Sequence, residues 1–195
     1  MRTRLGIMVL VVLALLAWTV QASEPVKAYK GLIFGESQSE TNKKVMADKS
    51  LQGNVWACFT KVGGEQYGIQ FDFDEDRLYL IRLTSNFPFT TRKYGPQHFD
   101  RALADLEPLR QVIEAQYGPP HVVDDITFLD MRDGRVAFKY AWNINGVKAI
   151  TIGVACQRYE YWAELSIGYI PILSEIGARE SQEKAEQITG SASDF

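Results

Sequence analysis

The clearest hydrophobic pattern in the chain lies between Phe99 and Gly118. Its apolar residues recur at three-, four- and seven-residue steps, as on one face of an α-helix: Phe99, Leu103, Leu106, Ile113 and Tyr117. Gly118 and Pro119 end the pattern, because glycine can close a helix and proline does not continue one. Pro108 lacks an N–H, so either the helix kinks there or its main body begins at Asp105. We favour a start at Asp105.

A second helix is expected over residues 38–48, near the beginning of the chain. Ser37 is followed three residues later by Glu40, which is the spacing of a capping box. Val45 and Met46 are the few apolar residues of this segment. The helix is therefore only weakly amphipathic, and packing must stabilise it.

Three strands with short turns follow this helix. In the middle strand every second residue is apolar, from Tyr67 to Phe73, as in a strand with one buried face. Gly63-Gly64 and the acidic run Asp74-Glu75-Asp76 supply the turns on either side. We expect these strands over residues 54–61, 66–73 and 78–83.

The second half of the chain has the pattern of an antiparallel meander. Asp133-Gly134 and Asn145-Gly146 are the residue pairs that two-residue type I′ hairpins favour, since both central positions need positive φ. Strands are expected over residues 126–132, 135–144, 147–156 and 159–170. The whole pattern predicts an α+β fold, in which an antiparallel sheet of about seven strands carries two helices on one face. Each half reads as a helix followed by strands, which suggests two tandem units, residues 31–84 and 99–170.

Large aromatic residues are concentrated on the strands of this meander. If Ile144 pairs with Val147 across the Asn145-Gly146 turn, aromatic residues of one strand face small residues of the next. A tight turn at Gln157-Arg158 would bring the last strand into the same arrangement. The residues that would then project outward are Phe138, Tyr140, Trp142 and Trp162.

Exposed aromatic rings are typical of binding surfaces. The alternative is that these rings form the core, because a one-residue slip in register exchanges the two faces of a strand. A second candidate for binding is the loop over residues 85–96, which contains Phe87 and Phe89.

The first 22 residues have the features of a secretory signal peptide. Arg2 and Arg4 precede an apolar run that ends at Val20, and cleavage is expected after Ala22. The alternative, a retained membrane anchor, is less suited to this run, because sixteen residues span only about 24 Å of a ~30 Å hydrocarbon core. We therefore expect an exported, periplasmic or secreted protein without a membrane anchor, with one α+β domain over residues 23–173. A flexible or helical tail would follow over residues 174–195.

Composition and charge exclude only a few classes of function. The chain has 21 basic and 24 acidic residues, and an aromatic content of 12% argues against disorder over most of its length. Nucleic-acid binding is not expected, since it favours clustered Lys and Arg. In an oxidising compartment, the two cysteines, Cys58 and Cys156, are predicted to form a disulfide. The alternative is two buried thiols.

Motifs for catalysis, cofactors and metals do not stand out. Asp72, Asp74 and Asp76 alternate as in a calcium loop, but Arg77 and Leu83 stand where that loop requires Gly and Glu. The two histidines lack the spacing of a metal site. The sequence therefore predicts no catalytic residues, no metal and no cofactor.

Two short motifs are similar to segments of small exported protein modules. Phe34-Gly35-Glu36-Ser37 opens a helix, and Tyr117-Gly118-Pro119-Pro120 closes one. Both resemble segments of the SmpA/OmlA type of outer-membrane assembly protein and of the β-lactamase-inhibitor-protein fold. The resemblance covers about twenty residues and implies a protein-binding module built of helices and antiparallel sheet. The chain lacks the lipid-acceptor cysteine of the SmpA/OmlA pattern.

Two functions are consistent with these observations. The first is an exported, non-enzymatic module that binds an envelope protein or inhibits an enzyme through the aromatic sheet face or the 85–96 loop. The alternative is a periplasmic carrier whose sheet curls around a small apolar ligand.

Overall fold

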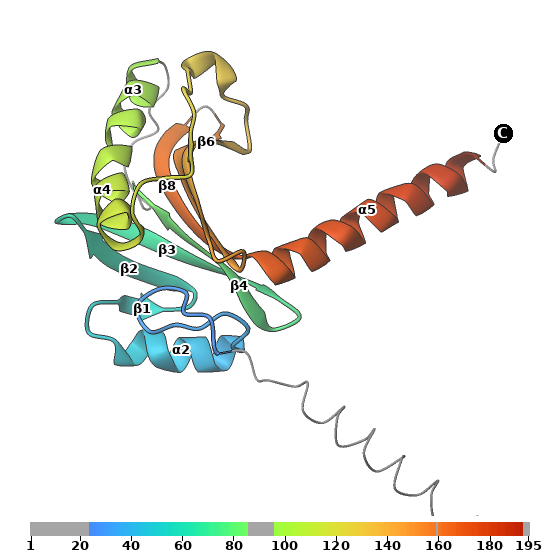
Figure 1. Ribbon diagram of the computed structural model, residues 1–195, viewed down its shortest axis with the longest axis horizontal. Helices are drawn as coiled ribbons and strands as arrows, with labels where there is room; N and C mark the ends of the chain where they lie inside the picture. The colour runs from blue at the N-terminus through green and yellow to red at the C-terminus, as the bar shows by residue number, and fades with distance from the viewer. Residues whose placement is uncertain (1–23, 86–95, 159, 193–195) are drawn as a thin grey trace, which may run out of the picture.

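One antiparallel sheet of eight strands organises the fold. The computed structural model describes residues 24–85, 96–158 and 160–192 (Figure 1). Across the sheet the strands follow the order β1-β2-β3-β4-β8-β7-β6-β5, so the two halves of the chain meet where β4 pairs with β8. The predicted α+β class with an antiparallel sheet is confirmed. The strands are β1 (Gln52–Asn54), β2 (Ala57–Val62), β3 (Glu65–Asp74), β4 (Arg77–Thr84), β5 (Val122–Val123), β6 (Arg135–Ile144), β7 (Lys148–Gln157) and β8 (Glu160–Tyr169).

The first helix, α2 (Gln38–Ala47), begins at the predicted capping box. The Glu40 N–H donates to Ser37 Oγ at 3.3 Å, and Glu40 Oε2 accepts from the Ser37 N–H at 3.1 Å. These reciprocal bonds satisfy two of the N–H groups that a helix leaves unpaired at its start. The predicted boundary is therefore explained by local chemistry.

The predicted helix at 99–118 is divided into α3 (Pro96–Ala104) and α4 (Leu106–Tyr117). Asp105 lies between them and is the N-cap residue of α4, although its side chain makes no capping bond. Pro108 lacks an N–H and its ring would crowd the carbonyl of Ala104, so one continuous helix is unfavourable. The predicted start at Asp105 is confirmed, and α3 is an additional element.

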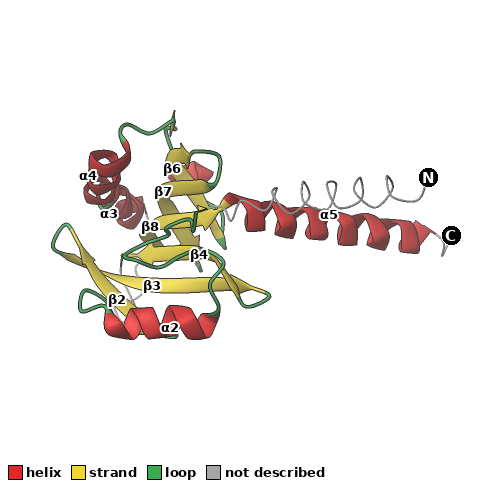
Figure 2. Cartoon of the chain, turned by 60° about the horizontal axis from the view of Figure 1, so that its bottom comes forward, coloured by secondary structure: helices red, strands yellow, loops and turns green. Residues whose placement is uncertain are grey.

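The two faces of the sheet differ in burial. Ile69, Ile81, Leu165 and Ile152 share one face, which we call the inner face, and each is at most 3% exposed. The outer face of the first four strands carries polar residues such as Gln70 and Arg82. Helix α2 packs against β1 and β4, whereas α3 and α4 pack against β7 and β8. Figure 2 shows α2 on the β2 side of the sheet and the α3–α4 pair beside β7 and β8.

The turn between β6 and β7 differs from its predicted geometry. Asn145 and Gly146 have positive φ, but Ile144 pairs with Lys148 instead of Val147. The Val147 carbonyl leaves the ladder and accepts from the Ile170 N–H at 3.0 Å, at the start of the last helix. The predicted register next to this turn is therefore wrong by one residue, because a later segment of the chain binds the turn.

A β-bulge at Lys139 then restores the predicted register, so that Phe138 pairs with Gly153 as expected. A Cβ on Gly153 would lie 2.2 Å from the Ala137 carbonyl oxygen, so glycine is needed where the bulged strand approaches. Between the turn and the bulge, the β6 side chains therefore lie on the face opposite to the predicted one. Tyr140 and Trp142 lie on the inner face, opposite Ile152 and Ile150, and Trp142 is only 2% exposed. The prediction that both rings project outward with Phe138 is wrong.

The segment predicted as a strand over residues 126–132 forms no strand. It contains a single 3₁₀ turn, η1 (Phe128–Asp130), and the short strand β5 lies before it. Asp130 Oδ2 accepts from both the N–H and the hydroxyl of Thr127, each at 2.7 Å. These side-chain bonds favour a turn over a sheet ladder.

The predicted disulfide is wrong, because Cys58 and Cys156 are buried but not bonded to each other. Cys58 lies on β2 and Cys156 on β7, with β3, β4 and β8 between them. Four strand spacings of about 4.8 Å far exceed the distance that a disulfide can bridge. Burial also raises the pKa of the Cys58 thiol, which makes it a poor nucleophile.

The last helix, α5 (Ile170–Ala192), extends away from the sheet (Figure 1). Its first turns contact the β3–β4 turn through ion pairs, Arg77 with Glu175 at 2.9 Å and Arg179 with Glu75 at 3.0 Å. Within the described ranges, α5 included, no helix is both long and apolar enough to cross a membrane.

The first prediction concerns Trp142, which joins the sheet to the end of α4. Its Nε1–H donates to the Gly118 carbonyl at 2.9 Å from a fully buried position. Replacement by Phe removes this bond and leaves a void, so Trp142→Phe should lower the free energy of unfolding by about 2 kcal/mol. Urea unfolding followed by circular dichroism measures this. The matched control is Trp56→Phe, because Trp56 is 80% exposed. Equal stability of the two variants would contradict the proposed contribution of the Trp142 hydrogen bond and packing.

Candidate functional site

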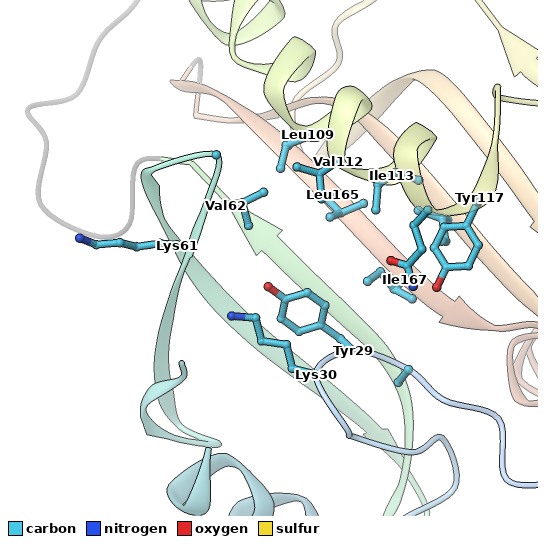
Figure 3. Close-up of a pocket in the computed structure, with 14 residues that line it drawn as sticks. Tyr29, Lys30, Lys61, Val62, Leu109, Val112, Ile113, Tyr117, Leu165 and Ile167 are labelled. Carbon is cyan, nitrogen blue, oxygen red and sulfur yellow. The ribbon is translucent and has the colours of Figure 1, made fainter. Parts of the chain in front are cut away.

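A cavity of about 340 Å³ opens on the inner face between α4 and the segment at residues 28–30 (Figure 3). Its floor is formed by Ile150 of β7 and by Leu165 and Ile167 of β8. Helix α4 forms one wall, and the opposite wall is the turn at residues 28–30 together with the end of β2. The volume falls within the range of roughly 300 to 1,000 Å³ that is usual for small-molecule sites.

A tight turn places Tyr29 and Lys30 at the cavity. Lys27 and Ile33 form an isolated β-bridge, and the Leu32 N–H donates to the Tyr29 carbonyl at 3.0 Å. The central residues of this turn, Lys30 and Gly31, have φ of 46° and 79°. Positive φ costs a lysine conformational energy, so the surrounding contacts must hold it there. This segment, residues 27–33, is a miniature hairpin laid over the inner face.

Bonds to neighbouring residues fix the Lys30 side chain. Its ammonium donates to Thr60 Oγ1 at 2.8 Å and to Ser50 Oγ at 3.0 Å, and it lies 5.5 Å from the centre of the Tyr29 ring. Burial raises the pKa of Tyr29, so its hydroxyl remains protonated and able to donate. Figure 3 shows the Tyr29 ring and the Lys30 side chain lying next to each other beside the cavity.

Lys148 connects the two walls of the cavity, the miniature hairpin and α4. This lysine is 6% exposed, and its ammonium donates to Tyr117 Oη at 2.8 Å and to the Lys27 carbonyl at 3.2 Å. Tyr117 belongs to α4 and Lys27 to the miniature hairpin, so one side chain from β7 bonds to both. Because the Tyr117 oxygen accepts from a cation, its own hydroxyl proton is available as a donor toward the cavity.

The α4 wall contributes apolar side chains at helical spacing. Leu109 and Ile113 are buried, whereas Val112 is 44% exposed at the mouth of the cavity. On the same helix, Arg110 binds Glu107 through two hydrogen bonds, of 2.9 and 2.6 Å, and also pairs with Glu114. The Arg110 guanidinium lies 6.0 Å from the centre of the Tyr140 ring, so this charged network connects α4 to β6.

The lining of the cavity is mainly apolar and contains no acidic residue. Its cations are Lys30 and Lys61, and its uncharged polar groups come from Tyr29, Gln116 and Tyr117. Among the described residues, no group of three or more His, Cys, Asp or Glu side chains is placed to hold a metal ion. The arrangement suits a small molecule with an apolar body and polar or negative groups.

The aromatic residues singled out from the sequence do not form one surface. Phe138 lies on the outer face and is 45% exposed, and Trp162 lies on the same face, partly buried and paired with Ala155. Tyr140 and Trp142 lie on the inner face beneath α4, with ring centres 6.4 Å apart. Phe87 and Phe89 fall outside the described residues.

Sequence reasoning did not identify the miniature hairpin as part of a site. The sequence predicted no element over residues 23–30, although Ala28 is buried and Tyr29 and Lys30 line the cavity. The sequence signal that could have located this hairpin is Lys30-Gly31, since a residue followed by glycine between short apolar segments is typical of a tight turn.

Comparison with protein-family models, with curated proteins and with solved structures finds no match for this chain. The resemblance of its two short motifs to exported modules therefore receives no support from these comparisons.

The second prediction concerns the charge network of the α4 wall. Hydrogen bonds from Arg110 and Gln111 lower the pKa of Glu107 to about 2, against an ordinary value of 4.5. The stabilisation is therefore complete above about pH 4.5 and is lost as the pH falls toward 2. Glu107 is about half exposed, so Glu107→Gln should cost no more than about 1 kcal/mol at pH 7.

Urea unfolding at pH 7, 5 and 3 tests this, because the difference between wild type and Glu107→Gln should shrink below pH 5. Glu183→Gln, an exposed change on α5, is the control. A difference that stays constant with pH would show that the Arg110 bonds do not stabilise the wall.

Proposed function

We propose that the protein is a non-enzymatic, exported carrier that binds a small amphipathic molecule in the inner-face cavity. The observation that carries this proposal is the cavity itself, which has an aliphatic floor on β7 and β8 and walls supplied by both halves of the chain. A site of this kind can bury the apolar body of a ligand and leave its polar end at the rim. Export rests on the pattern of residues 1–22, which lie outside the described residues.

Preorganisation of the walls supports binding. Lys148 connects the miniature hairpin to α4, and the Lys30 side chain has fixed partners before any ligand arrives. Groups that are already ordered lose little further entropy on binding. A ligand would therefore meet a cavity that is formed in advance.

Binding of an envelope protein, the first hypothesis from the sequence, stays a prediction. The register places Tyr140 and Trp142 on the inner face, which divides the proposed aromatic surface. Exposed apolar side chains do occur near the edge strand β5, among them Val122, Val123 and Leu129. Capture of a stoichiometric protein partner by the purified chain would favour this hypothesis over the carrier.

The third prediction tests occupation of the cavity with Nile red, a neutral dye whose fluorescence increases in apolar surroundings. Val112 lies at the mouth of the cavity and is 44% exposed, so a larger side chain there should obstruct entry without disturbing the core. Val112→Trp should weaken Nile red binding by about tenfold or more, because contacts worth roughly 1.4 kcal/mol per tenfold are lost. The measurement is a fluorescence titration at fixed protein concentration.

The matched control is Ala115→Trp, which places the same side chain on α4 at an exposed residue that does not line the cavity. This variant should bind the dye like the wild type, and both variants should keep the wild-type melting temperature. Equal binding by wild type and Val112→Trp would reject the inner-face cavity as the site.

A further inference from the structure

A second hollow, of about 320 Å³, adjoins the inner-face cavity beside β1 and β2. Three lysines line it, Lys30, Lys49 and Lys61, and we call it the lysine hollow. Its remaining polar side chains are the neutral hydrogen-bonding groups of Ser50, Gln52, Thr60 and Gln66. No acidic residue lines it, although acidic residues outnumber basic ones in the chain as a whole. The lysine hollow is therefore positive in a protein that is negative overall.

These lysines form no salt bridge in the described residues, although Asp48 lies near enough to Lys30 for the two charges to attract each other. None of the ion pairs found there involves Lys30, Lys49 or Lys61. The carboxylate of Asp48 is engaged elsewhere, since it accepts from the Ser50 N–H at 2.8 Å and from the Ser50 hydroxyl at 2.7 Å. Three cations around one hollow repel one another, and an anion placed between them would relieve that repulsion.

The lysine hollow and the inner-face cavity share two residues, Lys30 and Lys61. Figure 3 shows Lys61 extending outward from β2, away from Leu109 and Ile113, whereas Lys30 lies beside the Tyr29 ring. An apolar compartment and a cationic compartment thus meet at these two lysines. One elongated molecule can occupy both.

Lys30 has the geometry of a residue placed to bind at this boundary. Its positive φ of 46° directs the side chain from the miniature hairpin to Thr60 on β2. Of its three contacts, the one to the Ser50 carbonyl is long, at 3.5 Å, whereas the other two are 2.8 and 3.0 Å. An anionic oxygen can replace that long contact and keep the two short ones.

From this arrangement we propose that the ligand is an anionic amphiphile, whose apolar chain occupies the inner-face cavity and whose carboxylate or phosphate head occupies the lysine hollow. The inference rests on the proposed carrier function and specifies its ligand class. Charge-assisted hydrogen bonds from lysine to such a head are short and roughly twice as strong as neutral ones. Part of this attraction is exposed, so the affinity should fall as salt is raised.

Three probes of equal chain length, decanoate, decanol and decylammonium, separate the contribution of the head from that of the chain. Their affinities are measured by displacement of Nile red from the purified protein, below the concentration at which any of them aggregates. Decanoate should bind about tenfold more tightly than decanol, and decylammonium should bind most weakly. Decyl phosphate, compared with decanoate, then shows which of the two head groups is preferred.

The test variant replaces all three lysines, as Lys30→Gln, Lys49→Gln and Lys61→Gln, which keeps side-chain length and hydrogen-bonding capacity but removes the charge. In this variant decanoate should bind no more tightly than decanol, so that the tenfold preference of the wild type for the anionic head is lost. Lys184→Gln is the control, because α5 lines neither compartment. Circular dichroism shows whether the triple variant is folded, and the ratio of the decanoate and decanol affinities is measured within that one variant.

Two results would overturn the inference in distinguishable ways. If decanoate, decanol and decylammonium bind equally well, or the triple variant retains full affinity for decanoate, the lysine hollow does not bind the head while the carrier function stands. If none of the probes nor Nile red binds the wild-type protein, the carrier function itself fails, and the ligand class fails with it.

Discussion

Pairing of β4 with β8 is the contact on which the rest of the structure depends. Both strands are central in the sheet, and their five paired positions join the two halves of the chain into one surface. That surface has a continuous apolar face, which has to be removed from water. Helix α2 packs against β1 and β4, and α3 with α4 packs against β7 and β8, so the strip between these helices is covered only in part. The inner-face cavity lies above this strip, on Leu165 and Ile167 of β8 and Ile150 of β7.

The N-terminal segment also covers part of this strip, and a few polar contacts hold it there. The miniature hairpin of residues 27–33 has a turn in a conformation that is unfavourable for lysine, and the long-range bonds of Lys30 and Lys148 hold it over the sheet. A fully apolar hairpin could have closed the cavity. Instead, the chain places Lys30 and Lys61 in the lining of the cavity, at and beside β2. This combination of an apolar floor with lysines on one wall supports the proposed ligand class.

Much of the fold could be predicted from local sequence, because the signals were local. The capping box at Ser37 and the effect of Pro108 act within one helical turn, and both gave correct boundaries. The register of β6 could not be predicted in the same way. Val147 leaves the ladder because Ile170, more than twenty residues later, donates to its carbonyl. The bulge at Lys139 then returns Phe138 to its predicted partner. The faces of β7 and β8 were predicted correctly, although Gln157 pairs with Glu160 and the turn therefore begins one residue later than predicted.

The candidate site was harder to predict, because its parts are distant in sequence. Lys30, Lys61, Tyr117 and Ile167 meet only after the sheet has formed. The disulfide was predicted from compartment and cysteine number, and strand order then placed Cys58 and Cys156 too far apart. The sequence predicted a binding surface of aromatic residues, whereas the inner-face cavity has an aliphatic floor with lysines at its rim.

The measurement that tests the central claim most directly is a two-dimensional ¹H–¹⁵N correlation spectrum of the protein during titration with decanoate. The account predicts that the amide shifts which change will cluster at Lys30, Val62, Val112 and Ile167, around the inner-face cavity and its boundary with the lysine hollow. Changes centred on Phe138 and Trp162, with the cavity unaffected, would place binding on the outer face and contradict the account.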